Sequence, residues 1–487
     1  MRFDLPRVRK LAAWALVAAG VAAAGALAAG GRVQPGLAAL VVSLVLAAAA
    51  AGWTRTRPWS GPLLFWAALS LPLVKHLGTG TGLAAINADH VILYPVDVVI
   101  AVLLADAALA RWTSRGGRAD AGAFVRALGR LVKPDLVGWA VLATAAAAVV
   151  STYDAPRPLL AWVALVDVAR WYFAYVLFRE LAGSGLRGVV VGLAVAAAAH
   201  SALCVVEFLA QNNFGLWEKP GWGGFVAAGA NPKLATVPAV RGGGTFEPNV
   251  TAYFLQMALP FLAVYFLAAR RLGRRVLFLA AGALAAAALF VTFSRGGWFG
   301  AGVALLVLLV VAWARRRDLG APVWLLALLT AAAVVMALPA TAILLARRGA
   351  ADQLSAVSRL ADWRIALQII RDHPLLGVGR GNYLAISRLY SPWAFAYPVH
   401  NVYLWFWAET GLSGLAALAV MLYGGFRAAA RAARRGGEGI LFGAAALAAF
   451  TGVAFRMLVS MSFVHPFVCL TFLALAGAAA AAASRDE

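Results

Sequence analysis

Charged residues are scarce in this sequence, and acidic residues are the scarcest of them. Only 13% of the 487 residues are Asp, Glu, Lys or Arg, and Asp and Glu together number 20. Soluble globular domains carry about 25% charged residues, so the composition argues against one. Barrel-forming segments of about ten residues with alternating hydrophobicity are missing too. We therefore expect helices that cross a membrane.

Patterns for metal binding and for disulfides are also missing. The two cysteines, Cys204 and Cys469, lie in apolar stretches without CxxC or Cys/His spacing, so neither a zinc site nor a disulfide is supported. The loops expected outside the membrane contain no Asp-x-Asp or Glu-x-Asp pair that would bind a divalent cation. The net charge of +22 is divided into short clusters between apolar runs, which orient helices more often than they bind nucleic acid.

Hydrophobic residues make up 63% of the chain, and its mean hydropathy is +0.83. We predict an all-α polytopic membrane protein with about 12–14 transmembrane helices, of which the third and the fourteenth are the weakest candidates. The candidate spans lie near 11–30, 36–53, 61–75, 90–110, 135–150, 159–178, 188–210, 250–269, 276–293, 297–313, 322–345, 400–425, 439–459 and 465–484.

The positive-inside rule predicts the orientation of these spans. The first apolar stretch follows a basic start, and its length favours a retained helix over a cleaved signal peptide. With the N-terminus in the cytoplasm, the alternate loops collect the basic clusters, whereas the other short loops hold mostly single basic residues, and both termini are cytoplasmic. This predicts a helical bundle over 1–346 with an external loop at 211–249, an external loop at 347–399, and C-terminal helices over 400–487.

The external loop at 347–399 contradicts the orientation rule, because it carries seven arginines. One interpretation is a solvated loop, since long loops obey the rule less strictly. The other is an anion-binding surface, because guanidinium groups match phosphate oxygens and stay charged. Within it, the spacing of apolar residues from Ser358 to Arg371 predicts an amphipathic helix along the membrane surface, with Arg364 on it.

His400 stands where this loop meets the next apolar segment and is followed by Asn401. An imidazole can accept a proton near neutral pH, although it could merely form hydrogen bonds at the interface. Arg295 lies in a tight turn between two apolar segments, where an arginine indicates function or snorkels to the interface. Asp167 and Arg170 are three residues apart and are expected to pair. Glu409 is expected to face away from His400.

Five short motifs together resemble the superfamily of O-antigen ligases and O-antigen polymerases, most closely over residues 240–425. They are Gly244-Thr-Phe-Glu-Pro-Asn249, Ser294-Arg-Gly-Gly-Trp298, the stretch Arg359 to Arg371, Asp372-His-Pro-Leu-Leu-Gly-Val-Gly379, and His400-Asn401 followed after nine residues by Gly411-Leu-Ser-Gly414. The resemblance implies a GT-C-like membrane fold in the bacterial inner membrane. It also implies a metal-independent, inverting glycosyltransferase that uses no cofactor and whose active site faces the periplasm.

The resemblance further implies a donor, an acceptor and roles for particular residues. A glycan would leave undecaprenyl diphosphate and join a hydroxyl of lipid A-core or of another glycan, within the lipid bilayer and without nucleic acid. His400 would be the general base, and Arg295 and Arg364 would hold the diphosphate. Weaker candidates for substrate binding are Arg241, Arg359, Arg371, Tyr397 and Asn401.

Two alternatives stay open. The His-Asn signature favours an O-antigen ligase of lipopolysaccharide assembly over a polymerase of O-antigen or exopolysaccharide repeats, although the polymerases share much of the motif set. A transporter of lipid-linked glycan would also need many helices and a basic cavity, but its charges should follow a path through the membrane midplane. The strongest candidates here gather at one face.

Overall fold

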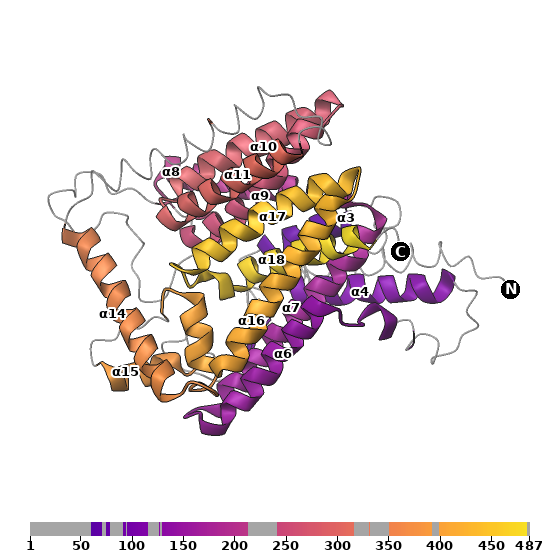
Figure 1. Ribbon diagram of the computed structural model, residues 1–487. Helices are drawn as coiled ribbons and strands as arrows, with labels where there is room; N and C mark the ends of the chain where they lie inside the picture. Colours follow the sequence, from indigo (N-terminus) through magenta and orange to yellow (C-terminus); the bar gives the residue numbers. More distant parts are fainter. Residues whose placement is uncertain are drawn as a thin grey trace, which may run out of the picture.

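The computed structural model describes residues 60–70, 75–77, 91–93, 95–114, 126, 129–212, 241–315, 331, 350–391 and 399–484. These residues form helices (Figure 1), apart from two three-residue strands, β1 (Lys75–Leu77) and β2 (Val91–Leu93), which pair in antiparallel fashion. The prediction of an all-α polytopic membrane protein is confirmed.

Within the described residues, nine helices are long and apolar enough to cross a membrane. They are α6 (Leu136–Val150), α7 (Pro158–Ser184), α8 (Leu186–Ala210), α9 (Pro248–Ala268), α10 (Leu272–Val291), α11 (Arg295–Ala314), α16 (Val402–Arg434), α17 (Glu438–Met457) and α18 (Pro466–Ala483). Each matches one of the predicted spans. α6 continues into the short helix η1 (Ser151–Asp154), and η2 (Ser462–Val464) precedes α18.

The other five predicted spans have no counterpart among the nine helices of the described residues. Those near 11–30, 36–53 and 322–345 lie outside the described residues. The span near 61–75 corresponds to α3 (Ser60–Ser70), which covers the described part of it. The span near 90–110 corresponds to α4 (Pro95–Ser114). Every 18-residue stretch of α4 contains its three charged residues, Asp97, Asp106 and Arg111, whereas each of the nine spanning helices has such a stretch with at most two.

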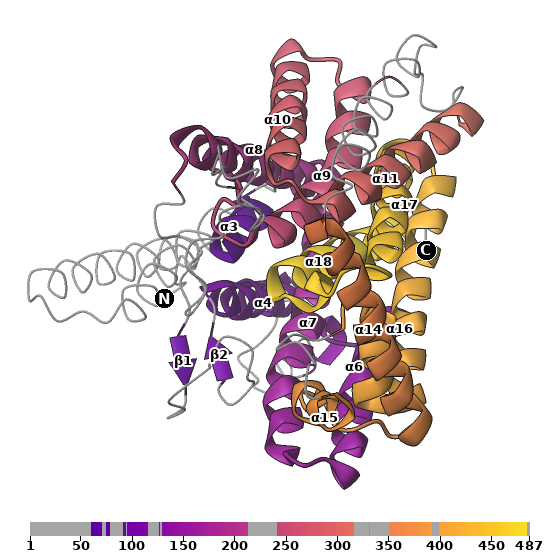
Figure 2. The same cartoon turned by 90° about the vertical axis from the view of Figure 1, so that its left-hand side faces the viewer.

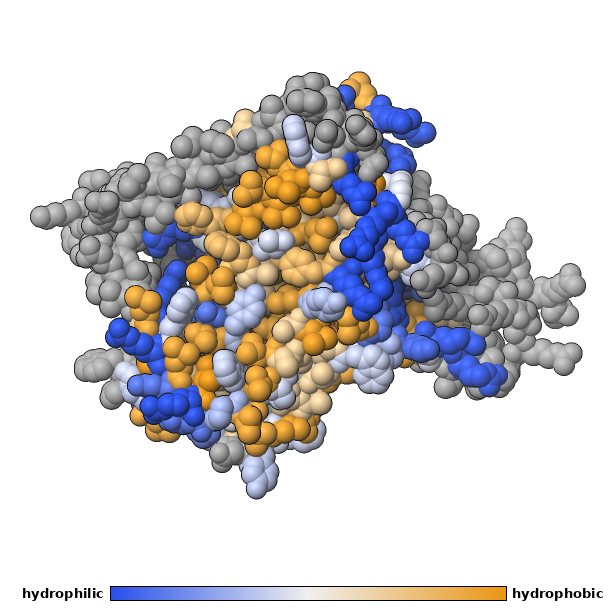
Figure 3. All heavy atoms as spheres, viewed as in Figure 1, coloured by the Kyte–Doolittle hydropathy of each residue, from blue (hydrophilic) through white to orange (hydrophobic). Residues whose placement is uncertain are grey.

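The spanning helices alternate in direction, so the bundle has two ends. We call one the site face, where α6, α8, α10 and α17 end and α7, α9, α11, α16 and α18 begin. Two further helices, α14 (Ala350–Asp372) and α15 (Tyr383–Tyr390), lie at this end, on the left of Figure 1 and in front in Figure 2. The opposite end is the basic face. Figure 3 shows an apolar zone between hydrophilic residues gathered at the two ends, as a membrane-spanning bundle requires.

Small residues let the central helices approach closely. α18, the Gly/Ala-rich span that was one of the two weakest candidates, is the most enclosed of the nine helices together with α9, and 83% of its residues are buried inside the bundle. A side chain at Gly477 would meet the carbonyl oxygen of Tyr175 on α7 at 2.3 Å. In a membrane, helices associate through such close van der Waals contact, because lipid provides no hydrophobic driving force between them. The low side-chain volume of α18 therefore places it in the centre of the bundle.

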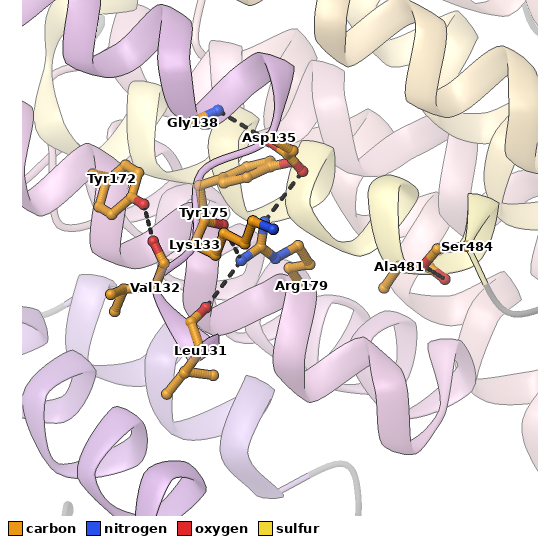
Figure 4. Close-up of polar contacts among 10 residues, drawn as sticks. All are labelled: Leu131, Val132, Lys133, Asp135, Gly138, Tyr172, Tyr175, Arg179, Ala481 and Ser484. Atoms are coloured by element: carbon orange, nitrogen blue, oxygen red, sulfur yellow. Dashed lines mark hydrogen bonds and ion pairs between the residues drawn. The ribbon is translucent and has the colours of Figure 1, made fainter. Parts of the chain in front are cut away.

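A polar clamp fixes the start of α6 at the basic face (Figure 4). Asp135 caps α6 by accepting a hydrogen bond from Gly138 N at 3.1 Å, and its other carboxylate oxygen accepts from Tyr175 and Arg179. Arg179 also donates to the carbonyl oxygens of Leu131 and Lys133, at 2.9 Å and 2.8 Å. The cap satisfies a helix donor that would otherwise lack a partner. The clamp thus ties α6 to α7.

A second charged cluster lies inside the bundle. Arg170 on α7 forms ion pairs with Asp167 on the same helix and with Asp97 on α4, to which its Nη2 donates at 3.0 Å. The predicted pairing of Asp167 with Arg170 is confirmed. Because Arg170 bridges an aspartate on each helix, the cluster ties α4 to α7.

Candidate functional site

His400 lies on the site face at the start of α16. It follows the buried Val399 and precedes Asn401, whose side chain caps α16 by accepting a hydrogen bond from Leu404 N at 3.1 Å. The His400 side chain is about one third exposed, and its Nδ1 lies 3.7 Å from Oδ2 of Asp362. That Nδ1 is buried and has no hydrogen-bond partner. An aspartate thus stands beside the predicted base.

Asp362 comes from the buried face of α14. Ile365, Ala366 and Ile369 share this face and are buried, whereas Leu360 and Leu367 are more than half exposed. A helix therefore spans the predicted amphipathic segment, and its exposed leucines are available to the membrane surface along which the prediction placed it. Side chains buried on α14 pack with Val399 and Ala408 around the start of α16.

The arginines of α14 divide between its two faces. With about 100° per residue, Arg359 lies about 60° from Asp362 around the helix, whereas Arg364 lies about 160° away. Arg359 is half-buried, and Arg364 and Arg371 are exposed. Arg371 forms an ion pair with Asp372 at 3.1 Å. The structure therefore brings Arg359 to the His400 side of α14 and leaves Arg364 and Arg371 on the outer side.

The turn between α14 and α15 docks into a break in α16. Gly411 has φ 65° and interrupts the helix, and the backbone amides of Val378 and Gly379 donate to the carbonyl oxygens of Ala408 and Glu409, both at 2.9 Å. A side chain at Gly411 would meet the carbonyl oxygen of Leu375 at 2.0 Å. Glycine is required here both for the positive φ and for the close approach.

Arg380 and Glu409 complete this docked turn. Nη1 of Arg380 lies 2.9 Å from Oε2 of Glu409, and the other carboxylate oxygen accepts a hydrogen bond from Tyr383 N. The guanidinium group also lies over the rings of Trp405 and Phe406. Burial, followed by the charges of Asp362 and Glu409, raises the pKa of Tyr383. Glu409 therefore pairs with Arg380 and not with His400, as the helical spacing predicted.

Arginines from three segments gather around Asn249 and Ser294, also on the site face. We call the set Arg241, Asn249, Ser294, Arg295 and Arg456 the arginine centre. Arg241 donates to Asn249 Oδ1 at 3.2 Å, and Arg456 donates to Ser294 Oγ at 2.9 Å and to the carbonyl oxygen of Asn249 at 2.8 Å. Arg295, half-buried, is the first residue of α11, next to the capping Ser294.

Two helices begin at the arginine centre. Asn249 lies in the first turn of α9, and Ser294 caps α11, accepting from Gly297 N. Helix N-termini carry partial positive charge and unpaired backbone donors. Together with the guanidinium groups, they make this part of the site face suited to bind an anion.

The segment before α9 is held by a buried carboxylate. The backbone amides of Gly243 and Gly244 donate to Oε2 of Glu207 at 2.8 Å and 2.6 Å. Gly244 has φ 69° and lies against the ring of His200, which a side chain would meet at 2.7 Å. This anchoring fixes Arg241, whose Nε donates to the carbonyl oxygen of Thr292 at 2.7 Å. His200, which the sequence did not mark as a site residue, therefore supports the loop that positions Arg241.

Arg456 is the member of the centre that the sequence did not place in the site. It is 1% exposed, and its guanidinium carbon lies 3.7 Å from the centroid of the Tyr253 ring. Among the described residues, no carboxylate forms an ion pair with it. The only signal in the sequence was an arginine inside an apolar span, which is costly enough to indicate a function.

A hydrogen bond connects the His400 region with the arginine centre. Tyr403, in the first turn of α16, donates to the carbonyl oxygen of Ala454 at 2.9 Å, two residues before Arg456 on α17. α16 and α17 are extensive neighbours in the bundle. His400 and the arginines therefore belong to one face and to adjoining helix ends.

Tyr397 lies outside the described residues. Asn401 is nearly buried and its Oδ1 is engaged in the helix cap, so its contact with an acceptor stays a prediction, as do the roles of the arginines. No group of three or more metal-ligating side chains occurs in the part of the chain that the structure describes.

Fold and site together define a multi-pass membrane protein with a cationic site at one end of its helical bundle. Residues 280–419 match a family model described as O-Antigen ligase. The matched segment includes Arg295, Arg364, His400 and Glu409, and it confirms the resemblance to the superfamily of O-antigen ligases and polymerases. The match supports an enzyme of glycosyl transfer. No curated protein matches the chain.

Proposed function

We propose that this protein is an O-antigen ligase. It transfers a glycan from undecaprenyl diphosphate to an acceptor hydroxyl at the periplasmic face of the bacterial inner membrane, for lipopolysaccharide assembly. The observation that carries the proposal is the placement of His400 and the arginine centre on one face of the bundle, in a chain whose residues 280–419 match the O-Antigen ligase model. The site face is, in this proposal, the periplasmic one.

The arginine centre binds the diphosphate of the donor. Arg241 and Arg295 present guanidinium groups where α9 and α11 begin, and such groups form bidentate hydrogen bonds with phosphate oxygens. As the glycosidic bond breaks, negative charge grows on the diphosphate. Cations already held in place stabilise that charge without further reorganisation.

The reaction is a single displacement with inversion. His400 takes the proton of the acceptor hydroxyl, whose oxygen forms a bond to the anomeric carbon. The bond from that carbon to the diphosphate oxygen breaks, and undecaprenyl diphosphate leaves with the electron pair. No step needs a metal ion, because the arginines stabilise the leaving group.

Arg364 enters the proposal with less support than Arg295. It lies on the outer side of α14, so it would reach a donor only from that side. Arg359, on the inner side, is the better placed α14 arginine for the His400 region. The exposed Arg364 and Arg371 would meet phosphate groups of lipids or of the donor at the membrane surface.

Reconstituted transfer tests the proposal. Purified undecaprenyl diphosphate-linked glycan is supplied to the protein in liposomes, with either lipid A-core or more lipid-linked glycan as acceptor. We expect transfer to lipid A-core by wild type, loss of transfer in His400→Ala and Arg295→Ala, and near wild-type transfer in the control Arg388→Ala, an exposed arginine on α15.

Each other outcome points to a different function. Joining of lipid-linked glycans to one another, without transfer to lipid A-core, would identify a polymerase of O-antigen or exopolysaccharide repeats. Movement of unreacted glycan lipid across the bilayer would identify a transporter. Full transfer by His400→Ala would contradict the assignment of His400 as the base.

A further inference from the structure

We propose that Asp362 is the positioning residue of His400, accepting a hydrogen bond from its Nδ1–H and leaving Nε2 to take the acceptor proton. The inference rests on the proposed function, in which His400 is the general base. It adds a residue from α14 that no sequence motif singled out.

The two side chains already lie next to one another. Nδ1 of His400 is 3.7 Å from Oδ2 of Asp362, and this nitrogen is buried without a hydrogen-bond partner. The Asp362 side chain is only 9% exposed, and among the described residues His400 is the basic side chain within ion-pair distance of it. A buried carboxylate needs a partner, and a buried imidazole nitrogen needs one too.

The distance is about 0.5 Å longer than an ordinary N–H···O hydrogen bond. Hydrogen bonds between catalytic groups are often long without substrate and shorten in the complex. Asp362 is well held for this purpose, since α14 packs its buried face around the start of α16 and Tyr383 Oη donates to the Asp362 carbonyl oxygen at 3.5 Å. A small movement of the His400 ring would complete the bond.

The pairing has two chemical consequences. A neutral imidazole carries one donor and one acceptor nitrogen, and a carboxylate at Nδ1 fixes the proton there, so that Nε2 is the acceptor. When Nε2 takes the proton of the acceptor hydroxyl, the ring becomes an imidazolium, and the adjacent carboxylate stabilises its charge. Asp362 itself exchanges no proton in this step.

The test compares Asp362→Asn and Asp362→Glu with Asp372→Asn, which changes an exposed aspartate at the end of the same helix. Initial rates are measured in the liposome assay with undecaprenyl diphosphate-linked glycan and the acceptor that wild type uses. We expect Asp362→Asn to lower kcat roughly 10- to 100-fold, less than the roughly 100- to 10,000-fold that a general base itself contributes, while KM stays within about threefold. Asp362→Glu should recover most of the rate, because it keeps a carboxylate, and Asp372→Asn should resemble wild type.

A double-mutant cycle separates positioning from a general loss of fold. If Asp362 acts through His400, Asp362→Asn should cause no further loss in a His400→Ala background. An equal loss in both backgrounds, or a wild-type kcat in Asp362→Asn, would overturn the inference. Transfer lost in His400→Ala but kept in Asp362→Asn overturns the inference alone, whereas full transfer in His400→Ala overturns the proposed function as well.

Discussion

Arg456 carries a positive charge into the interior of the bundle, where no carboxylate of the described residues pairs with it. An isolated charge in such a place costs stability. The guanidinium group is partly compensated by three oxygen acceptors and by the ring of Tyr253. This arrangement holds Asn249 and Ser294, and through them the arginines beside them. We therefore interpret Arg456 as a residue that positions the site and lowers the stability of the folded bundle.

Replacing Arg456 with methionine should therefore separate stability from activity. We expect Arg456→Met to keep the thermal midpoint in detergent within a few degrees of wild type, because an apolar side chain suits the site. Transfer should fall at least about tenfold, because Arg241 and Arg295 lose the support of Asn249 and Ser294. The midpoint is measured by tryptophan fluorescence and the transfer in liposomes. A large drop in the midpoint with unchanged specific activity would contradict this interpretation.

The two faces of α14 lead to a second prediction for single residues. Arg359 shares the His400 side of the helix, whereas Arg364 points away from it. We expect Arg359→Ala to reduce kcat/KM for the donor roughly tenfold and Arg364→Ala to reduce it less than threefold, with the donor varied at low density in the membrane. Parallel assays of the two variants measure which loss is larger. A larger loss in Arg364→Ala than in Arg359→Ala would make Arg364 the principal α14 contact of the diphosphate.

At the scale of elements, the break in α16 couples the charged loop to the membrane helices. α16 is helical before and after Gly411, and the turn after α14 fills the break with backbone hydrogen bonds and the Arg380–Glu409 ion pair. The outcome is that α14, with Asp362, is fixed relative to His400 at the start of α16. The sequence indicated the glycines of this turn but not the helix that receives them.

Gly411→Ala should therefore disrupt the docked turn. Its side chain would meet the Leu375 carbonyl oxygen at 2.0 Å, and its positive φ adds a strain of about 1–3 kcal/mol. We expect a lower thermal midpoint and a loss of transfer. The control is Gly302→Ala on α11, where a side chain would have nothing within 4 Å, so the change should be neutral or stabilising by up to about 1 kcal/mol. Equal midpoints for the two variants would show that the break does not depend on glycine.

Across the whole molecule, hydropathy predicted the spans well because a membrane requires long apolar helices whatever their partners. The nine spanning helices of the described residues each had a predicted counterpart. Hydropathy did not locate the ends of the spans: it placed one near 61–75, of which the described residues show α3 over 60–70. It also could not show that α18 is central, since that depends on the close approach of Gly477 to α7.

The site was only partly predictable for a similar reason. His400 and Arg295 stand out in the sequence because each lies next to long apolar segments, where an ionisable residue is costly. Asp362 and Arg456 do not, because their relevance comes from contacts with residues 38 and 162 positions away in the chain, Asp362 with His400 and Arg456 with Ser294. Helical spacing identified the segment of α14 as amphipathic but did not show which of its residues pack against the protein. Tertiary packing against α16 decides which face is buried.

The charges of the loops predict the orientation of the whole bundle, and cysteine labelling tests this prediction. Both natural cysteines, Cys204 and Cys469, are fully buried, so a membrane-impermeant maleimide should label wild type weakly. Leu389→Cys places a thiol on the exposed part of α15 at the site face, and Gly436→Cys places one in the exposed turn between α16 and α17 at the basic face. In cells whose outer membrane alone has been opened, we expect labelling of Leu389→Cys and not of Gly436→Cys, because basic loops stay in the cytoplasm. Opening the inner membrane should then expose Gly436→Cys. The reverse pattern would place the arginine centre in the cytoplasm, which would contradict transfer at the periplasmic face.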